Sequence, residues 1–157
     1  MNGSTGVGLV EIYDIDTQTP FSSEKVLNVS TRGRVGTGDE RLIAGVVIND
    51  TTPKRVLIRA VGPTLSALGV NGSLADPTLR LIRQDTGLTV RENDDWGRGN
   101  DATLVTNVAA QVGAFSLPVG SKDAALLITL PPGVYTAIVG TATGASGIAL
   151  VEVYEVP

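Results

Sequence analysis

The residues best suited to chemistry form a cluster of carboxylates and amides past the middle of the chain. Asn93, Asp94 and Asp95 are consecutive, and Asp101 follows shortly after in a segment that contains glycine. Carboxylate and amide oxygens are the hard ligands that calcium prefers, so these four residues are the candidate metal ligands. Their spacing differs from the twelve-residue calcium loop held between two helices. The alternative, which we favour, is a turn in which Asp and Asn side chains bond to the nearby backbone.

Trp96, the only tryptophan of the chain, directly follows this cluster. An exposed indole beside polar side chains could stack on a sugar ring, which would make a polysaccharide a ligand. An indole also buries a large apolar area when it packs in a core. Core packing is the interpretation that we favour, with ligand stacking as the alternative. Apart from calcium, no cofactor is expected.

The chain contains neither histidine nor cysteine. Serine, cysteine and zinc mechanisms that rely on an imidazole or a thiolate therefore have no such group available. A pair of carboxylates for glycoside cleavage stays open, because 16 acidic residues are present and their separation in space does not follow from the sequence. We expect a protein that is not an enzyme, with a small glycosidase as an alternative.

The charge and hydropathy of the chain narrow the range of partners. The formal net charge is -4 and the sequence pI is about 4.7, and the basic residues are scattered rather than gathered in a stripe. Such a chain lacks the basic field that attracts nucleic acid. No apolar run approaches the roughly 20 residues that span a bilayer. The polar first residues lack the apolar stretch of a secretory signal, which implies either a cytosolic protein or a piece of a longer one.

One strand-like segment occurs twice. Residues 3–15 align with residues 144–156 without a gap. Repetition at a fixed period is typical of tandem arrays, so we interpret the first copy as the closing strand of a preceding module. The identical pairs are Gly3/Gly144, Gly6/Gly147, Leu9/Leu150, Val10/Val151, Glu11/Glu152 and Tyr13/Tyr154.

A single sandwich offers one place for this strand, and we expect residues 144–156 to form a β-edge there. The extra copy must therefore lie on another sheet edge, pair with a neighbouring molecule, or remain unpaired. We expect neighbouring copies of the chain to share it, and the alternative is internal pseudo-symmetry with both copies in one sheet. The candidate interface consists of the matching apolar, acidic and aromatic positions of the two copies: Leu9, Glu11, Tyr13, Leu150, Glu152 and Tyr154.

The repeated glutamate needs a partner in each copy. Glu11 and Glu152 lie between leucine and tyrosine on the same face of the strand, so burying that face also buries a carboxylate. A buried carboxylate requires a compensating charge. Arg59, inside an apolar run, is the predicted partner of one glutamate, and Arg32 or Arg34 that of the other. We interpret these as structural ion pairs.

Short apolar runs separated by turn residues predict an all-β protein. The chain has 19 glycines and 8 prolines together with many β-branched residues. Residues 78–83 and 88–92 flank the turn at 85–87 and predict a hairpin. Residues 42–48 and 55–61 predict a second hairpin around the turn-rich residues 49–53.

The expected fold is an antiparallel β-sandwich, jelly-roll-like, with one or two short helices, and residues 1–157 form a single module. Residues 124–130, 134–139 and 148–156 supply three further strands. Residues 64–69 predict one helical turn ended by glycine. The only sustained helical spacing follows Asp101, and we expect this helix to cover one end of the sandwich.

Several phrases together resemble a repeat module of large secreted bacterial proteins, and the resemblance covers nearly the whole chain. It implies an extracellular or cell-surface location and neighbouring copies as partners. It implies no catalytic activity. The phrases lie at residues 27–39, 56–65 (VLIRAVGPTL), 74–79, 93–96 (NDDW), 112–115, 130–135 (LPPGVY) and 150–154 (LVEVY).

Residues 76–96 and 130–154 more distantly resemble the jelly-roll domain that follows the catalytic unit of some secreted bacterial peptidases. That resemblance implies a β-sandwich with an accessory binding or stabilising role, and calcium. The function that we expect is a non-catalytic structural or adhesive module of an extracellular repeat protein or fibre. The alternative is a carbohydrate- or calcium-binding accessory module of a secreted enzyme.

Overall fold

The computed structural model describes residues 6, 8–11, 26–98 and 102–157. The described residues form eight strands and two short helices, as expected for an all-β chain. In chain order the elements are β1 (Asn28–Val35), β2 (Leu42–Ile48), β3 (Lys54–Val61), α1 (Pro63–Ala67), β4 (Pro77–Arg83), β5 (Leu88–Asn93), α2 (Ala102–Gln111), β6 (Ala124–Leu130), β7 (Gly133–Thr141) and β8 (Gly147–Val156).

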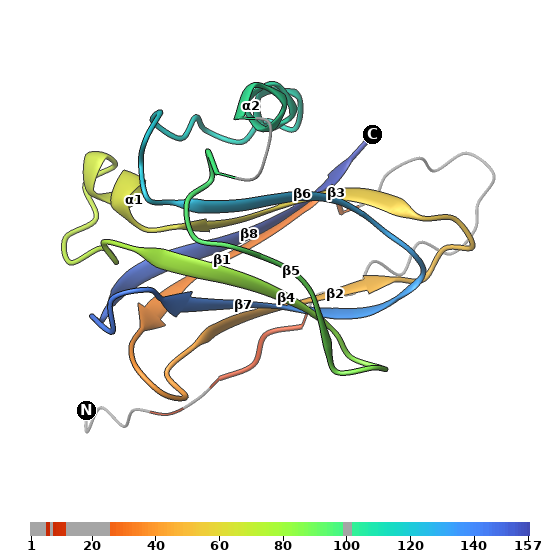
Figure 1. Cartoon of the computed structure of the whole chain (residues 1–157), viewed down its shortest axis with the longest axis horizontal. Helices are drawn as coiled ribbons and strands as arrows, with labels where there is room; N and C mark the ends of the chain where they lie inside the picture. Colours follow the sequence, from red (N-terminus) through yellow and green to blue (C-terminus); the bar gives the residue numbers. More distant parts are fainter. Residues whose placement is uncertain (1–5, 7, 12–25, 99–101) are drawn as a thin grey trace.

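The strands form two four-stranded antiparallel sheets that pack face to face (Figure 1). The strand order is β1-β8-β3-β6 in the first sheet and β2-β7-β4-β5 in the second. Several successive strands lie in opposite sheets, and the first and last strands pair with each other. This is the order of a jelly roll, in which two Greek keys wrap around one core. The predicted all-β sandwich is confirmed.

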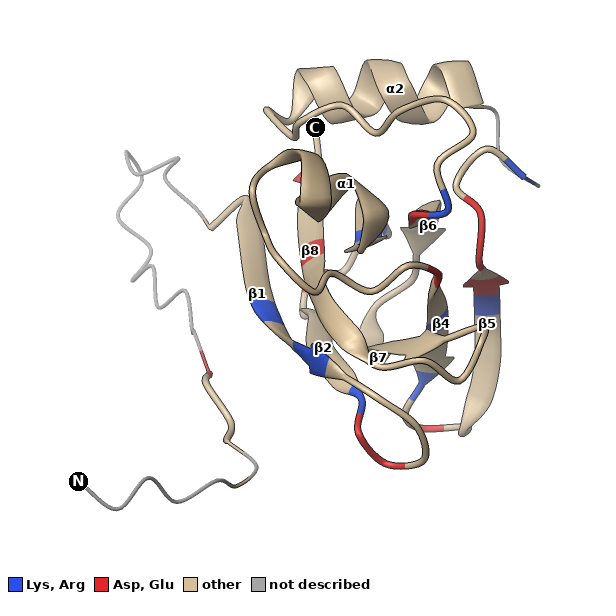
Figure 2. Cartoon of the chain, turned by 90° about the vertical axis from the view of Figure 1, so that its left-hand side faces the viewer, with Lys and Arg blue, Asp and Glu red and all other residues tan. Residues whose placement is uncertain are grey.

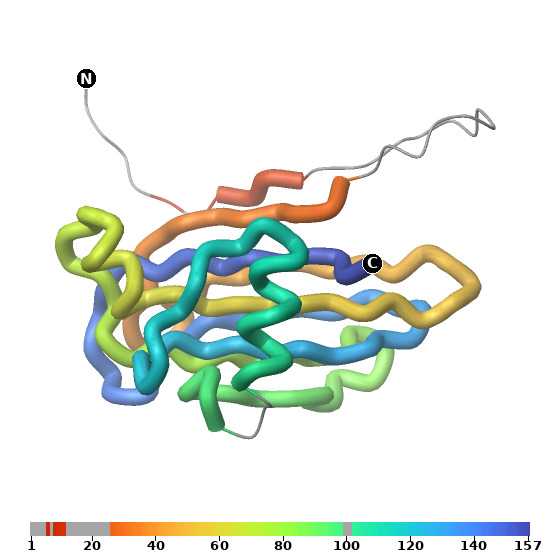
Figure 3. Tube along the Cα trace, turned by 90° about the horizontal axis from the view of Figure 1, so that it is seen from above, coloured from red at the N-terminus to blue at the C-terminus, as the bar shows by residue number. Residues whose placement is uncertain are grey.

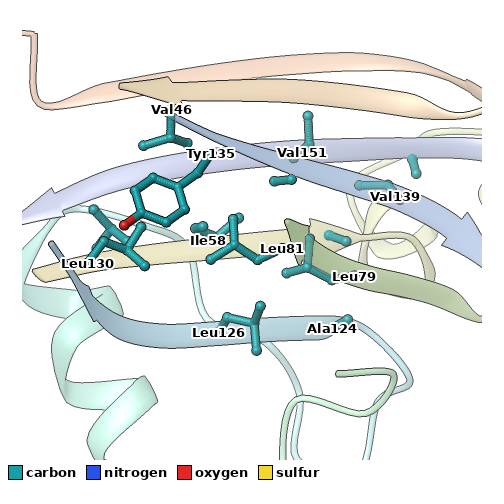
Figure 4. Close-up of a cluster of buried hydrophobic side chains, with 14 of the residues drawn as sticks. Val46, Ile58, Leu79, Leu81, Ala124, Leu126, Leu130, Tyr135, Val139 and Val151 are labelled. Carbon is teal, nitrogen blue, oxygen red and sulfur yellow. The ribbon is translucent and has the colours of Figure 1, made fainter. Parts of the chain in front are cut away.

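The core between the sheets is built from alternate residues of the facing strands. Successive side chains of a strand point to opposite faces, so Val56 and Ile58 of β3 enter the core together with Leu79 and Leu81 of β4. Tyr135 of β7 fills one end of this core (Figure 4). Its hydroxyl donates a hydrogen bond to the Pro131 carbonyl at 2.9 Å, which satisfies the polar end of a buried ring.

Helix α2 covers the outer face of the first sheet (Figure 3). Val105, Val108 and Ala109 form its apolar stripe, and they belong to a second cluster that includes Leu57 of β3 and Tyr154 of β8. The expected helix is therefore present, but its predicted position at one end of the sandwich is wrong. A stripe three and four residues apart packs on an apolar surface, and the outer face of this sheet offers one in Leu57 of β3, Ala125 of β6 and Val156 of β8.

One of the two predicted hairpins is confirmed. Strands β4 and β5 pair with each other around a turn in which Gly87 has a φ of 66°, a conformation that favours glycine. Strands β2 and β3 do not pair: β2 pairs with β7, and β3 lies between β6 and β8. The almost continuous apolar run of β3 needs cover on both faces, which an inner strand beneath a helix receives.

Candidate functional site

The closing strand β8 is an inner strand of its sheet. It pairs with β1 on one side and with β3 on the other, so that Val151 lies opposite both Thr31 and Ala60. The expectation that residues 144–156 form a sheet edge is therefore wrong. We call the space between β1 and β3 that this strand fills the β8 slot.

The β8 slot is selective at its first position. A Cβ atom on Gly147 would lie 2.6 Å from the Cα and 2.7 Å from the backbone nitrogen of Leu74. Backbone atoms cannot move aside cheaply, so only glycine fits here. Further along the strand, Ala149 and Val151 point into the core between the sheets and are almost fully buried. The slot thus accepts a strand of defined size and polarity.

A buried ion pair lies at the centre of the slot. Arg59 of β3 and Glu152 of β8 are Cα partners, with exposed fractions of 0% and 4%. The Arg59 Nε donates to Glu152 Oε2 at 2.8 Å, and Nη2 donates to the same oxygen. The predicted pairing of Arg59 with one of the two repeated glutamates is confirmed, with Glu152 as the partner.

Two aromatic residues complete the surroundings of this ion pair. The Arg59 Nη1 donates to the Phe115 carbonyl at 2.5 Å, and its Cζ lies 4.3 Å from the centre of the Phe115 ring. The Tyr154 hydroxyl donates to Glu152 Oε1 at 2.7 Å. Burial raises the pKa of Tyr154 to about 12, with further contributions from the hydrogen bond to Glu152 and from its charge. The network positions charges and stabilises the fold.

Ionisation of Tyr154 is expected to destabilise the fold at alkaline pH. The pKa of Tyr154 is about 12 in the fold, against an ordinary value of 10.0. A raised pKa favours the protonated form, so this stabilisation is complete below pH 10 and is lost as the pH rises to about 12. We expect Tyr154→Phe to show a weaker decline in melting temperature over this interval than the parent chain. An identical decline in both proteins would contradict the assignment.

The described part of the first copy lies outside both sheets. Residues 8–11 belong to no strand, and Leu9 and Val10 have exposed fractions of 81% and 87%. The segment 8–11, red in Figure 3, lies beyond β1, to the side of the sandwich (Figure 2). Tyr13 is outside the described residues. Pairing of Glu11 with Arg32 or Arg34 stays a prediction.

The acidic cluster forms a turn at the end of β5. The Asn93 side-chain nitrogen donates to the carbonyls of Asp95 and Arg98, both at 3.0 Å, and its oxygen accepts from the Ala125 N–H. This is the backbone bonding that the turn interpretation predicts for Asn93. Asp95 pairs with Arg98 at 3.1 Å. Within the described residues, which leave out Asp101, no group of three or more acidic side chains could hold a metal. Calcium binding by Asn93, Asp94, Asp95 and Asp101 stays a prediction.

Trp96 is a core residue. Its exposed fraction is 2%, and it packs in the cluster beneath α2. The indole Nε1 donates to the Pro118 carbonyl and to Ser121 Oγ, both at 3.1 Å. The alternative of ligand stacking is wrong for this conformation, because the ring offers no free face to a sugar. Core packing, the favoured interpretation, agrees with the structure.

A polar cleft of about 490 Å³ lies on the outer face of the second sheet. Arg41 crosses the strand face above Gly140, where a Cβ atom would lie 2.2 Å from Arg41 Nη1. Sequence patterns could not identify this cleft, because its lining comes from β4, β5, β7 and the residues just before β2 and just after β5, which only the sheet register brings together. The lining residues are Arg41, Thr78, Leu79, Arg80, Glu92, Asn93, Asp94, Ile138, Gly140 and Thr141.

Comparison of the chain with protein-family models, curated protein sequences and solved structures gave no match. Among the described helices, none has the length and apolarity needed to cross a membrane.

Proposed function

We propose that the chain is a non-catalytic structural or adhesive module of an extracellular bacterial repeat protein or fibre, in which neighbouring copies share strands. The observation that carries the proposal is the second copy of the closing strand. Its residues Leu9 and Val10 are exposed, whereas their counterparts in β8 are partly or fully buried. Exposed apolar side chains such as these contribute free energy of association when a neighbouring copy buries them.

The edges of the two sheets offer a place for such contacts. Within the described residues, β1 and β2 are the last strands of the two sheets on one side of the sandwich, and such edges can accept a further strand. A groove of about 180 Å³ runs between them and is lined by residues that include Val29 and Val47. Both side chains are exposed to solvent. The groove therefore supports association between copies on this side.

The resemblance to repeat modules of secreted bacterial proteins supports the extracellular location. The chain also lacks the imidazole and thiol groups on which the usual serine, cysteine and zinc hydrolases rely. Glu92 and Asp94 line the polar cleft, but both are exposed to solvent, and Arg80 is the strand partner of Glu92. This setting indicates that these charges balance one another on the sheet surface. It does not favour a pair of catalytic carboxylates.

Removing residues 1–17 is expected to abolish self-association. The full chain should show an average mass that rises with concentration in light scattering, whereas the truncated chain should stay monomeric. The two chains should melt at similar temperatures, because the removed residues that the structure describes contribute nothing to the buried core. A full-length control with Leu9→Ser and Val10→Ser keeps the length and removes the apolar side chains.

The outcomes of this experiment are distinct. Monomers that are equally stable with and without residues 1–17 would contradict strand sharing. Assembly that persists in the Leu9→Ser, Val10→Ser chain would show that other surfaces cause it. After either result, the repeated segment would no longer support the proposed function.

The second candidate, an accessory module that binds carbohydrate or calcium, now depends on the polar cleft rather than on Trp96. The cleft lies beside the acidic turn, and its lining holds charged and hydroxyl side chains. Aromatic rings, which commonly stack on sugars, are absent from the described residues that line it. The structural role therefore has the stronger support.

A further inference from the structure

We propose that residues 3–15 can fill the β8 slot of their own chain, so that two closing strands compete for one place in the fold. This inference deepens the proposed function, on which it rests for the idea that closing strands are shared. It specifies the place between β1 and β3, rather than an open edge, as the site that the first copy fits.

The first evidence is the match at the positions that the slot buries. The buried residues of β8 are matched by residues of equal or nearly equal size in the first copy. Gly8 is smaller than its counterpart, and Ile15 is larger by one methylene. The six pairs are Gly6/Gly147, Gly8/Ala149, Val10/Val151, Glu11/Glu152, Tyr13/Tyr154 and Ile15/Val156.

The second evidence is the glycine at the tightest point. Gly147 lies against the backbone of Leu74, where no other residue fits. The first copy has Gly6 at this position. A strand that paired only along an open edge would meet no such restriction.

The third line of evidence is that the acidic residue has the same position in both copies of the segment. Arg59 has an exposed fraction of 0% and needs a carboxylate from whichever strand lies beside it. Glu11 occupies the place of Glu152 in the alignment, with Tyr13 two residues later to donate to it as Tyr154 does. The first copy thus carries both side chains that the buried arginine requires.

The chain connection permits the exchange. In the observed pairing of β1 with β8, Asn28 is the partner of Tyr154, and the two strands are antiparallel. With Tyr13 in the place of Tyr154, residues 14–27 would join two adjacent antiparallel strands as a hairpin connection. A short tether gives a high effective concentration at the slot. Residues 144–156 would then be the strand left outside, so every chain presents one spare closing strand.

The test is a pair of matched substitutions in the full chain. Val151→Asp places a carboxylate in the core and prevents β8 from filling the slot, whereas Val10→Asp disables the first copy in the same way. Trp96, buried beneath α2, reports unfolding by its fluorescence. We expect each single variant to retain a cooperative unfolding transition and the double variant to lose it.

This result would be a strong departure from additivity, which is the signature of two groups that substitute for each other. If Val151→Asp alone abolishes the transition and Val10→Asp has no effect in either background, the inference is overturned. A midpoint for Val151→Asp that rises with protein concentration would place the donor on a second copy and overturn the within-chain form.

A cross-link supplies an independent measurement. Val61 of β3 is the partner of Leu150, so Leu9 would lie opposite Val61 only if the first copy fills the slot. The chain has no cysteine, so Leu9→Cys with Val61→Cys in the Val151→Asp background should form an intramolecular disulfide. Leu9→Cys with Ile43→Cys, on the other sheet, is the control and should not. Equal cross-linking of both pairs, or of neither, would contradict the proposal that the first copy fills the β8 slot.

These measurements separate the inference from the proposed function. They are made at concentrations at which light scattering shows monomers. Coupling, meaning a non-additive effect of Val10→Asp and Val151→Asp, in a full chain that does not assemble would support filling of the β8 slot by the first copy and contradict the proposed array. Assembly without coupling would do the reverse.

Discussion

Replacing Arg59 with methionine is expected to lower the free energy of unfolding by about 3–5 kcal/mol. The substitution leaves the Glu152 carboxylate in a nearly closed site with no positive charge beside it. Its Oε2 loses the hydrogen bonds from Nε and Nη2 of the guanidinium. The effect should appear whichever closing strand fills the slot, because Glu11 and Glu152 occupy the same aligned position. Urea unfolding followed by Trp96 fluorescence measures it.

The matched control combines Arg59→Met with Glu152→Gln. Glutamine removes the uncompensated charge and can still accept a hydrogen bond from the Tyr154 hydroxyl, so most of the lost stability should return. A loss below about 1 kcal/mol for Arg59→Met alone would place the pair among solvent-screened ion pairs and contradict its burial. A double variant no more stable than the single one would show that packing of the arginine side chain, rather than charge, is the main contribution.

The partner of Glu152 could be predicted because burial of a charge is costly wherever it happens. Arg59 lies inside the apolar run of β3, and Glu152 lies between apolar residues of β8. Each needs an opposite charge, and few candidates lie in runs of that kind. The sequence did not reveal the contribution of Phe115, whose carbonyl and ring both contact the guanidinium. Its position depends on the path of the chain after α2.

Strand pairing could be predicted only where it is local. The β4–β5 hairpin follows from alternating polarity around a turn with glycine, which neighbouring residues determine. The turn between β2 and β3 looks similar, yet it carries the chain from one sheet to the other. Whether such a turn joins two paired strands or crosses between the sheets depends on which strand faces the rest of the molecule covers. The same reason explains why β8 was expected at an edge: its position between β1 and β3 is a property of the whole fold.

The polar cleft was missed for a related reason, and so was a buried network in which Asp123 accepts hydrogen bonds from Gly62, Thr64 and Ser121. Each brings together side chains from distant parts of the chain, and none of them stands in a recognisable motif. Asp123 directly precedes the apolar strand β6 and is fully buried. A charged residue beside an apolar run was the one available signal, as it was for Arg59. Asp123, however, has no charged partner: it accepts from two backbone N–H groups and two hydroxyls, which no sequence pattern displays.

Replacing Asp123 with alanine is expected to lower the free energy of unfolding by about 3 kcal/mol. Its Oδ1 accepts hydrogen bonds from the backbone N–H groups of Gly62 at 2.8 Å and Thr64 at 3.3 Å, where α1 begins. Its Oδ2 accepts from the Thr64 and Ser121 hydroxyls. The hydroxyls can turn to other acceptors, but the two N–H groups would be buried without one. Thermal and urea unfolding measure the loss.

Asp123→Asn is the matched control, because its amide oxygen can still accept from both N–H groups while its amide nitrogen donates to the hydroxyl oxygens. It should lose less than half as much stability as the alanine variant. Ser121 also accepts from the Trp96 indole, so loss of Asp123 should disturb the packing of Trp96 and shift its fluorescence before global unfolding. Equal losses for the two variants would mean that the negative charge at the start of α1, rather than satisfaction of the N–H groups, is what stabilises this corner of the fold.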